Sequence, residues 1–202
     1  MKLSWGEIRA LARKNQAVDR LNDPELLAKN ITVSIAVPSL KLLEYVIDAK
    51  TVLDKFEIEN KVSIVAAHWS PKKTLRYIAE LESKGVEVII AGADGSAHLP
   101  GMIASLTNIP VIGVPINGAH LGGMDSLLSI VQMPRGVPVG TMAINSGYNA
   151  AIFACQILAL KHHDLKAKLR KHKEMLEKSV ESEDLQFSKK SHNHLLKNVG
   201  RL

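Results

Sequence analysis

Short apolar runs rich in β-branched residues alternate with helix-forming segments through the middle of this chain, and this alternation limits its fold more than any other feature. Continuous apolar strands separated by helices are typical of a parallel sheet that is covered on both faces. Because the crossovers in such sheets are right-handed, we expect a three-layer α/β/α sandwich with a flavodoxin- or Rossmann-like sheet. The predicted strands are Ile31–Val37, Val62–Ala67, Val86–Ala91, Val111–Val114 and Val137–Ala143, and the predicted helices are Ser39–Lys55, Pro71–Lys84, Leu99–Leu106, Met124–Val131 and Asn145–Leu160.

The two ends of the chain differ in kind from this α/β domain, which we place at residues 31–160. Residues 1–30 contain a capping-box pattern at Ser4 and Glu7 and predict a helical extension. Residues 161–202 predict a basic helical extension, whose first part carries one apolar stripe through Leu165, Leu169, Leu176 and Val180. That stripe has to be buried against the chain's own core or a neighbouring subunit. The residues from 181 onward are expected to be loosely ordered.

Charge and composition exclude several classes of function. The net charge of +6 comes from the ends, because residues 31–160 hold 9 basic and 10 acidic side chains. A nucleic-acid partner is therefore not indicated, since such proteins carry a basic face on the folded core. No apolar run is long enough to span a bilayer, the start lacks the apolar segment of a signal peptide, and the single cysteine, Cys155, suits a reducing compartment. We expect a cytoplasmic protein without a membrane partner.

Candidate functional residues gather in the turns that follow four predicted strands. These turns are Pro38-Ser39, Ala67–Pro71, Ala91–Gly101 and Pro115–Gly123. In a parallel sheet they meet at one edge, where open α/β sheets bind ligands. His68 and His98 would then face one crevice, and imidazole is the side chain that titrates near neutral pH. Each histidine taken alone is more often a structural polar residue than a catalyst.

The third of these turns is rich in glycine, with Gly92, Gly95 and Gly101 around Ser96 and His98. Glycines let backbone N–H groups approach a ligand, although a tight turn without a ligand explains them as well. Neither dinucleotide nor P-loop spacing is present. In the first turn, Ser39 and Lys41 form either a phosphate cradle or an ordinary helix cap with a solvent-facing lysine. The histidine pairs of the basic tail do not indicate a metal site.

With these residues placed, the chain resembles the family of 5-(carboxyamino)imidazole ribonucleotide mutases and aminoimidazole ribonucleotide carboxylases, over about residues 31–160. The bacterial mutase branch fits best. The resemblance rests on Ala97–Met102, Pro110–Pro115, Gly136–Val139, Asn149–Ala151 and above all on the unbroken block Asp125–Pro134.

The resemblance implies an enzyme of purine biosynthesis, an isomerase or lyase, that moves a carboxylate from an exocyclic nitrogen to a ring carbon through trapped CO2, without ATP, metal or cofactor. It implies His68 as the catalytic acid/base and an assembly of identical subunits, an octamer with C-terminal helices reaching onto neighbours. The implied substrate-binding residues are Ser39, Lys41, Ala67, Trp69, Gly92, Gly95, Ser96, His98 and Leu99.

The chain departs from the family pattern in the half of the site that binds ribose phosphate. Leu42 stands where the family has an aspartate, Trp69 replaces an arginine, and Asp94 replaces a glycine. A guanidinium that binds phosphate with two hydrogen bonds is not replaced conservatively by an indole. Two other hypotheses for the function therefore stay open. The chain is either a paralogue that carboxylates or decarboxylates another heterocycle, or a non-catalytic ligand-binding or assembly subunit.

Overall fold

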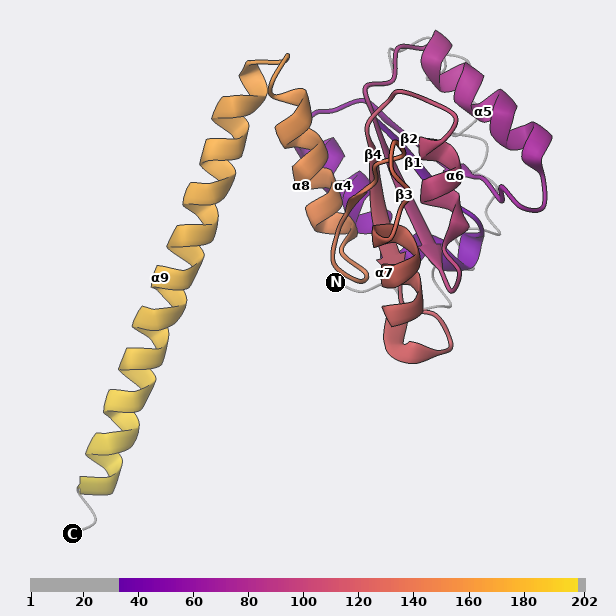
Figure 1. Ribbon diagram of the computed structural model, residues 1–202. Helices are drawn as coiled ribbons and strands as arrows, with labels where there is room; N and C mark the ends of the chain where they lie inside the picture. The colour runs from indigo at the N-terminus through magenta and orange to yellow at the C-terminus, as the bar shows by residue number, and fades with distance from the viewer. Residues whose placement is uncertain (1–32, 200–202) are drawn as a thin grey trace, which may run out of the picture. The chain divides into compact units, whose positions relative to one another are not determined.

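The computed structural model describes residues 33–199 and confirms the predicted α/β architecture (Figure 1). The sheet has five parallel strands in the order β2-β1-β3-β4-β5. The predicted N-terminal extension lies outside the described residues. In chain order the elements are β1 (Val33–Val37), η1 (Leu40–Tyr45), α4 (Ile47–Lys55), β2 (Asn60–Ile64), α5 (Pro71–Ser83), β3 (Val88–Asp94), α6 (His98–Ala104), β4 (Val111–Ile116), η2 (Leu121–Gly123), α7 (Met124–Val131), β5 (Gly140–Thr141), α8 (Gly147–Leu158) and α9 (Asp164–Val199).

The central strands are buried on both faces, as their unbroken apolar sequences predict. Every residue of β1 and β4 is buried, and so is β3 up to its last residue, Asp94. Helices α5, α6 and α7 cover one face of the sheet, while α4 and α8 pack together on the other (Figure 1). One buried polar pair lies between the sheet and α5, where Ser34 Oγ of β1 and Tyr77 Oη of α5 form a hydrogen bond of 2.8 Å.

Several predicted boundaries of helices and strands were wrong. The helix expected over residues 39–55 is divided at Val46 into η1 and α4. The carbonyl of Tyr45 at this division lies only 2.7 Å from the place a Cβ of Gly147 would occupy, so the start of α8 fits here because residue 147 is glycine. Strand β2 ends at Ile64, before a turn in which the Trp69 and Ser70 amides donate to the Ala66 carbonyl. Strand β5 is a two-residue edge strand.

The C-terminal segment forms a separate compact unit, residues 159–202. Its helix α9 runs from Asp164 to Val199 without a break. The expectation of loose order beyond residue 181 was wrong for the described part, because the helix continues through it. No helix among the described residues is both long enough and apolar enough to cross a membrane.

Candidate functional site

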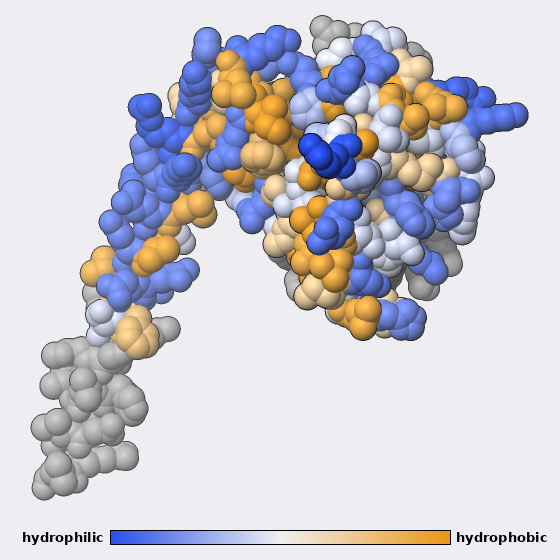
Figure 2. Space-filling model, in the orientation of Figure 1, coloured by the Kyte–Doolittle hydropathy of each residue, from blue (hydrophilic) through white to orange (hydrophobic). Residues whose placement is uncertain are grey.

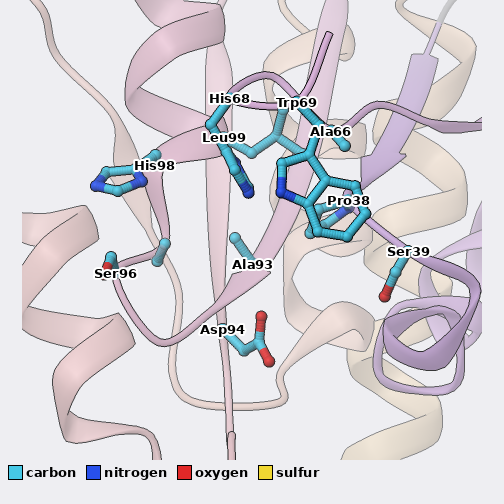
Figure 3. A pocket seen from close by; sticks show the side chains of 11 residues that line it. Pro38, Ser39, Ala66, His68, Trp69, Ala93, Asp94, Ser96, His98 and Leu99 are labelled. Atoms are coloured by element: carbon cyan, nitrogen blue, oxygen red, sulfur yellow. The ribbon is translucent and has the colours of Figure 1, made fainter.

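A pocket of about 420 Å³ opens over the carboxyl ends of β1, β2 and β3 (Figure 3). This edge includes the point where the strand order reverses between β1 and β3, which is the ligand-binding position of open α/β sheets. The sequence predicted that four turns after strands meet at this edge, and three of them line the pocket. The pocket is lined by Pro38, Ser39, Ala66, His68, Trp69, Ala93, Asp94, Ser96, Ala97, His98 and Leu99.

The two imidazole rings lie close together, edge to face, in the lining of this pocket. The ring centroids of His68 and His98 are 6.3 Å apart, and the ring planes meet at 70°. His68 comes from the turn after β2, while His98 is the first residue of α6. Both side chains are exposed to solvent in the single chain. At this separation the two rings leave no space for a ligand between them, and both are available to a ligand that lies in the pocket beside them.

Trp69 forms a second wall of the pocket. Its indole is 83% exposed, and it meets the His68 ring edge-on, with centroids 5.7 Å apart and planes at 75°. In Figure 3 the indole lies to one side of the hollow, between His68 and Ser39. An exposed aromatic face at the mouth of a polar pocket is suited to stacking on a flat ring.

The bottom of the pocket is formed by the end of β3 and the turn that follows. The Asp94 carboxylate lies below Ala93, between Ser96 on one side and Ser39 on the other (Figure 3). The Ala97 amide donates to the Asp94 carbonyl at 2.9 Å, and Ala97 itself has a φ of 39°. An alanine with a positive φ has a strained backbone, and strained backbone conformations are found more often at functional sites. This turn sets His98 and Leu99 at the start of α6.

Asp94 is the acidic residue of the pocket, and its described lining residues include no lysine or arginine. Burial raises the pKa of Tyr45, and the nearby Glu44 and Asp94 carboxylates raise it further.

The structure divides the predicted binding residues into two groups. Ser39, Trp69, Ser96, His98 and Leu99 line the pocket together with the predicted catalytic residue His68. The other four predicted residues are not among its lining residues: Lys41 is exposed on η1, Ala67 is buried, Gly92 is buried within β3, and Gly95 has a φ of 59° in the turn.

Five lining residues were missing from the predicted set: Pro38, Ala66, Ala93, Asp94 and Ala97. All of them occupy positions at or just after strand ends, which is the signal by which they could have been found. Leu42, which stands at the family's aspartate position, is only 7% exposed and belongs to the core. No group of three or more histidine, cysteine, aspartate or glutamate side chains that could hold a metal occurs among residues 33–188.

The fold and the strand-edge pocket define an α/β protein with an open parallel sheet and a pocket at its carboxyl edge, and comparison with known proteins gives the family. The AIR carboxylase family model matches residues 32–179, and the chain belongs to this family. This confirms the resemblance found in the sequence.

The curated relatives include both activities of the family. The N5-carboxyaminoimidazole ribonucleotide mutase of Saccharolobus solfataricus is 48% identical over 154 residues, which are 76% of this chain and 98% of the relative. The mutase of Thermotoga maritima is 49% identical over 132 residues, covering 65% of this chain and 77% of the relative. The phosphoribosylaminoimidazole carboxylase of Candida glabrata is 41% identical over 181 residues, 87% of this chain but only 31% of that longer protein.

Among solved structures, Treponema denticola PurE superimposes with a TM-score of 0.71. The match covers 76% of this chain and 96% of that one, at 21% identity, and it shows the shared fold.

Proposed function

We propose that this chain is a 5-(carboxyamino)imidazole ribonucleotide mutase-like enzyme of purine biosynthesis. It moves a carboxylate from the exocyclic nitrogen of an aminoimidazole ring to a ring carbon. The observation that carries this proposal is the close pair of imidazoles, His68 and His98, in the lining of one strand-edge pocket in a chain that is 48% identical to a mutase over nearly that protein's full length.

His68 acts as the acid and base of the reaction. It donates a proton to the exocyclic nitrogen as the N–C bond to the carboxylate breaks and CO2 is released. The electron-rich ring carbon then attacks the CO2, and His68 accepts the proton that this carbon loses. Imidazole suits both steps because the two protonation states of this side-chain type are both accessible near neutral pH.

The turn after β3 holds the carboxylate while it is transferred. Its serine hydroxyl, Ser96, and the backbone before α6 lie on the same side of the pocket as His98. Keeping the CO2 next to the ring carbon replaces a bimolecular encounter by a local one, which lowers the barrier. Because both imidazoles are exposed in the single chain, exclusion of water depends on the bound ligand or on a neighbouring subunit.

The ribose phosphate end of the ligand lies toward Ser39 and Trp69. The Ser39 hydroxyl donates to phosphate, the indole stacks on the flat part of the ligand, and Lys41 supplies a cation from the rim. Lys41 is exposed on η1, two residues after Ser39 in the chain.

The active form is a homo-oligomer, an octamer by resemblance. One observation in its favour is an exposed apolar surface on α7 and the turn before it, formed by Leu121, Met124, Leu128 and Val131, which are 48–76% exposed. Exposed apolar patches of this kind mark interaction sites. A second copy of the chain is the occupant that the family resemblance implies.

The experiment that tests the reaction is a turnover assay of the purified full chain with the carboxyamino substrate. We expect conversion by the unmodified chain and at least about a hundredfold loss in His68→Asn, the usual contribution of a general acid–base group. Ligand binding and unfolding of His68→Asn serve as controls and should be nearly unchanged. No conversion by the unmodified chain, or full activity of His68→Asn, would overturn the proposal.

A second function is favoured by one observation: in the lining of this pocket Trp69 stands in place of the family's arginine and Asp94 in place of its glycine, so a cation is lost and a carboxylate is gained. A carboxylate repels phosphate, whereas it accepts hydrogen bonds from an amine or a hydroxyl. The chain would then act on, or bind without reaction, a heterocycle that lacks the phosphate. Affinities for the aminoimidazole nucleoside and its 5′-phosphate separate the two cases. In the first, the phosphate increases the affinity; in the second it decreases it, and Asp94→Gly reverses the preference.

A further inference from the structure

The carboxylate of Asp94 lies in the pocket but has no part in the proposed reaction. Asp94 is the last residue of β3 and the exposed residue of that otherwise buried strand. In Figure 3 its carboxylate lies on the opposite side of Ala93 from His68 and His98, between Ser96 and Ser39. The imidazoles and this carboxylate therefore occupy different parts of one pocket of about 420 Å³, and a single ligand can contact both.

The position of Asp94 is set by the edge of the sheet. Its main chain pairs with Ile116 at the end of β4, and its carbonyl accepts a hydrogen bond of 2.9 Å from the Ala97 amide. The turn after β4 lies against its side chain. A Cβ at Gly118 in that turn would be 3.6 Å from Asp94 Cβ and 3.7 Å from Asp94 Oδ2, which is ordinary contact distance. The carboxylate is thus held at a defined place in the pocket.

No cation neutralises this carboxylate among the described residues. None of the ion pairs found there includes Asp94, and neither lysine nor arginine lines the pocket. On the outer surface of the domain, which Figure 2 shows as a mixture of hydrophilic and apolar residues, water solvates the charged side chains. A ligand that enters the pocket displaces such water. Binding is then favourable only where the ligand itself donates hydrogen bonds to the carboxylate.

The chemistry of a carboxylate limits which part of a ligand lies next to it. A carboxylate accepts hydrogen bonds through two oxygens and donates none, so it favours hydroxyl or amine donors over an anion. In the proposed function the flat ring lies toward Trp69, the transferred carboxylate toward Ser96, and the phosphate toward Ser39. The sugar connects the ring to the phosphate, and its two adjacent hydroxyls match the two oxygens of Asp94.

We propose that Asp94 recognises the ribose of the ligand by accepting hydrogen bonds from its two adjacent hydroxyls, which makes this chain selective for ribose over deoxyribose. The inference rests on the proposed function, because the ligand is taken from it. Asp94 acts in binding and specificity, and it transfers neither the proton nor the carboxylate. Since Asp94 stands where the family has a glycine, this contact is a property of this chain's own sequence.

Binding of non-reacting analogues to the purified full chain tests the proposal. The probes are 5-aminoimidazole-4-carboxamide ribonucleotide, in which an amide replaces the transferable carboxylate, and its 2′-deoxyribose counterpart. We expect the unmodified chain to bind the ribose form at least about tenfold more tightly, because a hydrogen bond to a charged group contributes at least that factor. Asp94→Ala should abolish this preference. Asp94→Asn, which keeps one neutral acceptor, should show an intermediate preference.

Glu44→Ala is the matched control. Besides burial, Glu44 and Asp94 both raise the pKa of Tyr45, but Glu44 does not line the pocket. This variant should therefore keep the preference of the unmodified chain. Denaturant unfolding of each variant confirms that it is folded.

The possible results separate this proposal from the proposed reaction. Equal affinities of the unmodified chain for the two sugars, or an unchanged preference in Asp94→Ala, would overturn the role of Asp94 alone, since turnover of the carboxyamino substrate is measured independently. Tighter binding of both sugars to Asp94→Ala by the same factor would show that the carboxylate repels the phosphate, and it would overturn the proposal as well. Absence of binding by either form would overturn the proposed function together with this inference.

Discussion

Replacing Gly92 by alanine tests whether this glycine serves the packing beneath the pocket rather than the approach of a ligand. A Cβ at residue 92 would lie 2.8 Å from Val46 Cγ1, 3.0 Å from Ile116 Cδ1 and 3.4 Å from Val37 Cγ1. All three neighbouring side chains are fully buried and have little room to shift. Overpacking of this kind costs about 2 kcal/mol. For a chain of 202 residues this lowers the melting temperature by about 4–8 °C.

The assay is chemical and thermal unfolding of Gly92→Ala, Val46→Ala and the double variant. Val46→Ala alone leaves a cavity and destabilises the fold. In the double variant the new methyl group enters the space vacated by Val46, so its loss of unfolding free energy should be smaller than the sum of the single losses by about 1 kcal/mol. Affinity for the ligand should change little in the folded variants. A Gly92→Ala protein of normal stability but weakened ligand binding would refute this reasoning.

Two further predictions concern the stability of the domain. Tyr77→Phe should destabilise the fold by about 1–3 kcal/mol, because it leaves the fully buried Ser34 hydroxyl without its hydrogen bond, and adding Ser34→Ala should recover part of this loss in denaturant unfolding. The ammonium groups of Lys84 and Lys61 lower the pKa of Glu80, against the opposing effect of its burial. The stabilisation from Glu80 is therefore present above the pKa of this carboxyl in the unfolded chain, and it is lost as the pH falls through the lower pKa in the folded chain. The free energy of unfolding of Glu80→Gln should lack this contribution to the pH dependence between about pH 6 and 3.

The fold could be predicted from the sequence because the strands are buried on both faces. An unbroken apolar run such as Val88–Ile90 can form few structures other than a buried strand in a chain of this composition. The limits of the elements depend on tertiary contacts instead. The division of the first helix at Val46 coincides with the close approach of Gly147, more than a hundred residues away in sequence. The apolar periodicity within residues 39–55 could not predict that contact.

The location of the site could also be predicted, since parallel strands place their following turns at one edge. The sequence could not predict which residues of a turn line the pocket, because the lining depends on the direction of each side chain. Ala67 and His68 are neighbours in sequence, yet Ala67 is 1% exposed while His68 lines the pocket. The departure of Leu42 from the family pattern could be seen in the sequence, whereas its burial as the core residue of η1 could not.

The most direct test of the proposed reaction follows the carboxylate itself. The carboxyamino substrate is prepared with ¹³C in its carboxyl group and is converted by the full chain in buffer containing unlabelled bicarbonate. Transfer through CO2 trapped in the pocket predicts that most of the label is found on the ring carbon of the product. Formation of product that carries only unlabelled carboxylate, or the absence of any product, would contradict a transfer within the pocket.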